Sequence, residues 1–179
     1  MIPHKKISEG ILLCQENVDR LAADAFILGE FGSHGHALAS IILAIEEYAK
    51  KIILYNYKLS PTAKNEAEVE KALYKHEIKL DWYVSKAVKT FDTKKLMEEQ
   101  GLDSEKLRKK VSDYKFSGLY TNWNKEEVSW SKPNRPEIKG QYKFFAKSLA
   151  YLMLDNESMI PEPYRQKNVD RVLKLINRG

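Results

Sequence analysis

The stretch that most constrains the fold of this chain is residues 34–59, which reads HGHALASIILAIEEYAKKIILYNYKL. Its apolar side chains repeat at helical spacing and cover almost the whole circumference of the predicted helix. Such a helix is normally central, because neighbouring elements must cover it on several sides. Two acids, Glu46 and Glu47, and two bases, Lys50 and Lys51, nevertheless occupy its middle. The sequence therefore predicts a helical core that contains charged groups.

The rest of the chain also favours helices, since only 8 Gly and 6 Pro interrupt its 179 residues. Residues 117–136 differ: they are rich in Trp, Asn and Pro and lack a helical period. We expect an irregular aromatic loop there, with a short hairpin around Asn124 and Lys125. No repeat or linker divides the chain, which predicts a single all-α domain over residues 1–179 with long antiparallel helices. The further predicted helices span residues 7–30, 65–91, 92–100, 103–117, 137–155 and 164–177.

The charge and cysteine content exclude several classes of protein. A net charge of +5 is mildly basic, so it permits contact with nucleic acid without demanding it. Cys14 is the one cysteine, so neither an internal disulfide nor a cysteine-based zinc site can form. No signal peptide or apolar run of membrane-spanning length is evident. We therefore expect a cytoplasmic protein without membrane contact.

The predicted first helix carries an apolar seam at alternating steps of four and three residues. This heptad-like spacing is typical of helices that pack along their length, and it predicts a homodimer formed through this helix. The seam consists of Ile7, Ile11, Cys14, Val18, Leu21, Ala25 and Leu28.

The charged residues of the central helix can pair within the helix. Glu46 with Lys50, and Glu47 with Lys51, stand four residues apart, and such pairs contribute about 0.2–0.5 kcal/mol when exposed. Glu46, however, borders the wide apolar face. A buried carboxylate there needs partners from a neighbouring helix, because an unpaired buried charge is very costly.

His76 is the best candidate for that partner, with Lys79 one turn further on. Residues 65–91 are expected to return antiparallel to the central helix, which brings the two helices side by side. The alternative is that His76 is a core histidine with a satisfied hydrogen bond. A Glu–His–Lys cluster could orient a substrate group, bind an anion or only fix the register of the helices.

Metal and cofactor sites are not expected. His76, Glu46 and Glu47 could supply three ligands, but adjacent residues on a helix point about 100° apart. The E-x-x-H pair of di-metal bundles is absent, and the HGH at residues 34–36 is better explained as a polar entry turn. The sequence also lacks a Gly-rich phosphate loop, H-E-x-x-H and G-x-S-x-G.

Three stretches, in this order and spacing, resemble the AbiV-type abortive infection proteins of bacteria. ALASIILAIEEYAKKIIL is similar to their EE-x-x-K helix, KHEIKL to their H-x-x-K segment, and SGLYTNWNKEEVSWSKP to their aromatic loop. That family is placed near the HEPN superfamily. The resemblance implies a HEPN-like helical bundle, often dimeric, that acts in defence against phage. The matching residues are Glu46, Glu47, Lys50, His76, Lys79, Leu119, Tyr120, Trp130 and Pro133.

Many HEPN proteins are metal-independent ribonucleases whose site is an R-x4-6-H motif completed across a dimer. This chain lacks that motif, and its nearest equivalent is Lys115 followed by Tyr120. Lysine can hold a phosphate, but tyrosine is a poor general base because its pKa is about 10. Whether the protein is an enzyme therefore stays open, with His76, Lys115 and Tyr120 as the candidate catalytic residues.

Three functions fit these residues. The first is a defence protein that binds a phage protein, a translation component or RNA. The second is a HEPN-type ribonuclease, and the third is a helical scaffold whose Glu–Lys–His cluster is purely structural. Tyr120, Trp123 and Trp130 are candidate binding anchors, although they fit a satellite core under the loop equally well. The candidate binding residues are Glu46, Glu47, Lys50, Lys79, Trp123 and Trp130.

Overall fold

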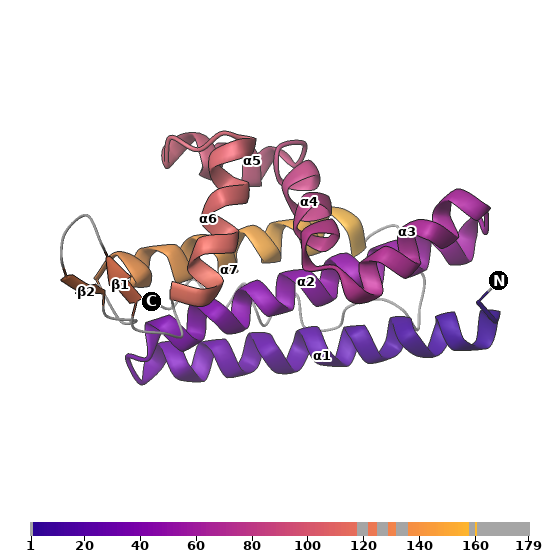
Figure 1. Ribbon diagram of the computed structural model, residues 1–179, viewed down its shortest axis with the longest axis horizontal. Coiled ribbons are helices and arrows are strands. Elements are labelled where there is room, and N and C mark those ends of the chain that lie inside the picture. The colour runs from indigo at the N-terminus through magenta and orange to yellow at the C-terminus, as the bar shows by residue number, and fades with distance from the viewer. Residues whose placement is uncertain (1, 118–121, 125–128, 132–135, 158–159, 161–179) are drawn as a thin grey trace.

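The computed structural model describes residues 2–117, 122–124, 129–131, 136–157 and 160. Two long helices, α1 (His4–Glu30) and α2 (His34–Leu59), run antiparallel along the length of the molecule (Figure 1). The turn between them contains Gly32 at φ +76°, a conformation that favours glycine. Apart from one small hairpin, every regular element in the described ranges is a helix, which confirms the all-α prediction.

The apolar seam of α1 is used inside the chain. Ile7, Ile11, Cys14 and Val18 are buried and belong to the same core cluster as the side chains of α2. The seam therefore has its partner within the chain and does not support a homodimer, and the homodimer itself stays a prediction. Any dimer would have to use a different surface.

Helix α2 is central, as its apolar circumference predicted. It contacts α1 and four further helices: α3, α4, α6 and α7. Glu46 and Lys51 are buried along with its apolar residues. Both charged side chains must therefore be satisfied by groups from these neighbours.

The single helix predicted over residues 65–91 is wrong, because it is broken at Lys75 into α3 (Ala63–Tyr74) and α4 (His76–Ala87). Lys75 is extended, with φ −106° and ψ 118°, and no Gly or Pro signals the break. The break lets each piece bury its own apolar side chains, among them Val69 on α3 and Tyr83 on α4. Figure 1 shows α3 lying along the end of α2 and α4 rising steeply away from it.

Helices α5 (Phe91–Glu99) and α6 (Ser104–Ser117) complete an arch above α2 with α4 (Figure 1). Gly101, at φ +63°, separates them, and Asp103 caps α6 by accepting a hydrogen bond from the Lys106 N–H at 2.8 Å. The carboxyl-terminal half of α6 returns toward α2, which it contacts. This return brings Lys115 to Glu46, in the middle of α2.

The last described elements are β1 (Asn122–Asn124), β2 (Ser129–Ser131) and α7 (Pro136–Glu157). The strands pair antiparallel with Trp123 opposite Trp130, so the expected hairpin is present within the aromatic loop. Helix α7 packs against α2, and the helix predicted at 164–177 lies outside the described residues. No helix in the described part of the chain is both long and apolar enough to cross a membrane.

Candidate functional site

The carboxylate of Glu46, in the middle of α2, is the centre of a polar cluster. His76 at the start of α4 places Nδ1 2.5 Å from Oε2, and Lys79, one turn later, places Nζ 3.4 Å from the same oxygen. Lys115 of α6 donates to Oε1 at 2.8 Å. The predicted contact between Glu46 and His76 is confirmed, and Lys115 joins it from a distant part of the sequence. We call Glu46, His76, Lys79 and Lys115 the Glu46 cluster.

The four side chains differ sharply in exposure. Glu46, Lys79 and Lys115 are only 2%, 6% and 12% exposed, whereas His76 is 62% exposed. The alternative that His76 is a core histidine is therefore wrong. The cluster has a buried base of charged groups and one accessible side chain, so a partner would reach it through the imidazole.

Hydrogen bonding defines which imidazole nitrogen is available. When Nδ1 of His76 carries the proton, it donates to Glu46 and leaves Nε2 as the ring nitrogen outside the cluster. The ammonium of Lys115 lies 3.3 Å from the same Nδ1, but both groups are donors in this tautomer, so the ring is fixed by the Glu46 carboxylate, which accepts from each of them. This arrangement can hold an anion beside the ring, or can move a proton at Nε2.

The charge balance of the cluster is positive. Burial alone would raise the pKa of Glu46, but hydrogen bonds from Lys115 and His76, together with their charges, lower it below its ordinary value. Glu46 is therefore ionised at neutral pH and supplies one negative charge. Lys79 and Lys115 supply two positive charges, and a protonated His76 would add a third.

Glu47 and Lys50 do not join this cluster. They pair with each other at 2.6 Å and line, with Cys14 and Arg20, a separate cavity of about 510 Å³. The predicted pairing four residues apart is thus wrong: Lys50 bonds to the glutamate three residues before it. Burial raises the pKa of Cys14 to about 12, which makes the thiol a poor nucleophile at neutral pH.

Lys51 forms a second buried ion pair that the sequence analysis missed. Its ammonium donates to Glu157, the last residue of α7, at 2.7 Å, and both side chains are buried. Burial lowers the pKa of Lys51, although the hydrogen bond and charge of Glu157 oppose that shift. Only the rule that a buried charge needs a partner could have pointed to this pair, and it does not identify the partner.

The aromatic candidates cannot be placed in the site. Leu119, Tyr120 and Pro133 lie outside the described residues, as do the side chains of Trp123 and Trp130. Within the described ranges, no three His, Cys, Asp or Glu side chains are grouped so that they could hold a metal ion. Glu46 has one histidine and two lysines around it, and a protonated lysine cannot be a metal ligand.

A search of curated proteins and a search of solved structures each gave no match. The family model described as AbiV, of the HEPN type, matches residues 6–152. This range includes every member of the Glu46 cluster and most of the chain. The family suggests a role in abortive infection, a bacterial defence against phage. Because the match spans far more than half of the chain, the chain belongs to the AbiV family.

Proposed function

We propose that this protein acts in abortive infection by binding RNA at the Glu46 cluster. The observation that carries the proposal is an exposed histidine held at Nδ1 by a buried carboxylate, with two lysines beside it. A structural ion pair does not need an exposed imidazole, whereas a binding site does. The group bound is taken to be a phosphate of the RNA backbone.

The surplus positive charge supports an anionic partner. Lys79 and Lys115 exceed the single charge of Glu46, and their burial weakens screening by salt and water. A phosphate next to His76 would balance this charge and could accept a hydrogen bond from the imidazole or from Lys115. The phosphodiester groups carry the negative charge of RNA, and the chain as a whole is basic.

Equilibrium binding of a labelled single-stranded RNA to the full chain tests the proposal. Lys115→Gln should weaken binding at least about tenfold, roughly 1.4 kcal/mol, and should make the affinity less dependent on salt. Lys109→Gln is the matched control, because Lys109 is an exposed lysine on the same helix. Equal affinities of the two variants would contradict the proposal.

RNA cleavage is the second candidate, and one specific observation favours it. A carboxylate that fixes Nδ1 of a histidine leaves Nε2 free to act as a general base or acid, and the nearby Lys115 could stabilise charge on a phosphate. Incubation with RNA, followed by analysis of the product ends, would test it. Cleavage that is lost in His76→Gln, while binding persists, would support the enzyme.

A phage protein or a translation component is the competing kind of partner. Capture of the protein from infected and uninfected cells, with bound RNA and bound proteins both identified, separates these partners.

The same proposal includes a cytoplasmic location and a homodimer. The exposed apolar side chains Leu13 and Ile27 of α1 offer a contact surface for such a dimer, which light scattering would detect.

A further inference from the structure

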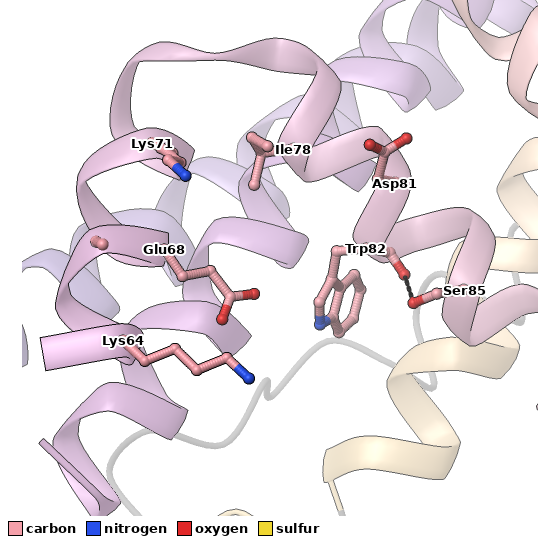
Figure 2. A pocket seen from close by; sticks show the side chains of 8 residues that line it. Lys64, Glu68, Lys71, Ile78, Asp81, Trp82 and Ser85 are labelled. Carbon is pink, nitrogen blue, oxygen red and sulfur yellow. Dashed lines mark hydrogen bonds between the residues drawn. The ribbon is translucent and has the colours of Figure 1, made fainter. Parts of the chain in front are cut away.

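A second cavity lies between α3 and α4, and no member of the Glu46 cluster lines it. Its volume is about 540 Å³, which is large enough for a small organic ligand. Figure 2 shows Lys64 and Glu68 of α3 extending into the space between the two helices, with the indole of Trp82 facing them from α4. The residues that line it are Lys64, Ala67, Glu68, Lys71, Ile78, Asp81, Trp82 and Ser85.

The apolar part of this cavity is anchored to the core. Trp82 and Ile78 are partly buried and pack against the core cluster. The ring of Tyr48 contacts Trp82 edge-on, with the centroids 6.1 Å apart and the planes at 71°. The ammonium of Lys86 lies 5.9 Å from the Trp82 ring. The indole is therefore held in place, and a ring held in place is a good platform for stacking.

Several polar groups that line the cavity have no partner among the described residues. Within the described part of the chain, the side chains of Lys64, Glu68 and Lys71 make no hydrogen bond or ion pair, and the indole N–H of Trp82 has no acceptor. Asp81 differs, because Arg108 binds it at 2.8 Å. The cavity thus offers one free carboxylate, two free ammonium groups and one free N–H around an apolar floor.

We propose that this cavity binds a nucleotide with a guanine-type base. The base would stack on Trp82, and the carboxylate of Glu68, which can only accept hydrogen bonds, would pair with the adjacent N1–H and N2–H donors of the base. Lys64 and Lys71 would meet the phosphate. In Figure 2 the Lys64 and Glu68 side chains extend toward the indole, as this arrangement requires.

The nucleotide could be free or part of an RNA strand, and in the second case the inference rests on the proposed function. Trp82 follows His76 by six residues on α4. Six residues correspond to about 9 Å along a helix axis. One strand could therefore place a phosphate at the Glu46 cluster and a neighbouring base in this cavity.

Calorimetric titration of the full chain with GMP, AMP and a short guanine-containing RNA tests the inference. GMP should bind more tightly than AMP, and Glu68→Gln should weaken GMP binding at least about tenfold. Glu70→Gln, an exposed glutamate on the same helix, is the matched control and should bind like the unaltered chain. Trp82→Leu should also abolish GMP binding. Because Trp82 packs on the core, that variant also alters the fold, so the decisive variant is at the exposed Glu68.

The outcomes for the two sites are separable. If GMP still binds to His76→Ala, and the unaltered chain does not bind RNA, this cavity is supported and only the proposed function is contradicted. RNA binding that requires guanine and is lost in Glu68→Gln would place the nucleotide in a strand. The inference would be overturned if GMP did not bind and Glu68→Gln left RNA binding unchanged. It would also be overturned if the ligand captured through Trp82 were a peptide.

Discussion

Helix α2 carries two buried acid–base groupings that use the same residue types in opposite ways. Glu46 faces His76, Lys79 and Lys115, and the imidazole of His76 is open to solvent. Lys51, five residues later, faces the carboxylate of Glu157 in an ion pair closed to solvent. The first grouping has more cations than acids, whereas the charges of the second pair balance.

The pKa shifts of Glu46 and Lys51 reflect this difference in their partners. The pKa of Glu46 is lowered because hydrogen bonds and charges from its cations outweigh the effect of burial. The pKa of Lys51 is lowered because burial outweighs the hydrogen bond and charge of Glu157 and the weaker effect of Asp19. A buried pair that balances its charge holds helices together, whereas a buried cluster with an accessible histidine also presents a side chain to solvent. Burial of a charge alone therefore does not identify a functional site.

Removing one member of the closed pair should have the largest effect on stability. Lys51→Met leaves the carboxylate of Glu157 buried without its cation, and we expect a loss of about 3–5 kcal/mol in the free energy of unfolding. Urea denaturation followed by circular dichroism measures it. Lys51→Met combined with Glu157→Leu should recover most of the loss, because neither charge of the pair then remains. A loss below about 1 kcal/mol in the single variant would refute a closed, structural pair.

Glu46→Gln should destabilise the protein less than Lys51→Met. It replaces charge-assisted hydrogen bonds by weaker ones, so a loss of about 1.5–3 kcal/mol is expected. The exposed His76 and the partly accessible Lys115 can turn toward water, which limits the cost. The same denaturation experiment measures it. If Glu46→Gln cost more than Lys51→Met, the Glu46 cluster would be the stronger structural element and the comparison would be reversed.

The stability contributed by Glu46 should depend on pH. Its pKa in the folded state lies below its ordinary value of 4.5, so the unfolded state binds more protons in the window between the two values. The contribution is complete above about pH 4.5 and is lost as the pH falls through the folded-state pKa. Unfolding free energies measured from pH 7 to pH 3 should therefore fall less steeply for Glu46→Gln. Parallel curves for the two proteins would contradict the lowered pKa.

His76→Ala should have the smallest effect on stability, below about 1 kcal/mol, because the imidazole is mostly exposed. His36→Ala provides the matched control, since His36 is also an exposed histidine near its helix start. Thermal denaturation of both variants checks this expectation. A large loss in His76→Ala alone would favour the helical scaffold, in which the cluster only staples helices.

The sequence predicted part of this picture well. The apolar circumference of residues 34–59 identified the central helix with its observed bounds, and the cost of an unpaired buried carboxylate led from Glu46 to His76. Neither argument reaches contacts between distant segments. Glu157 is 106 residues from Lys51, and Lys115 is 69 residues from Glu46. The break at Lys75 carries no Gly or Pro signal and results from tertiary packing, which a local pattern does not encode.

The most direct test of the central claim is the affinity of single-stranded RNA for two variants measured side by side. We predict that His76→Ala lowers the affinity at least about tenfold, while the double variant Lys51→Met/Glu157→Leu, which alters only the closed pair, binds RNA within about twofold of the unaltered chain. Equal affinities for His76→Ala and the unaltered chain, with both fully folded, would contradict the claim that the Glu46 cluster is a binding site.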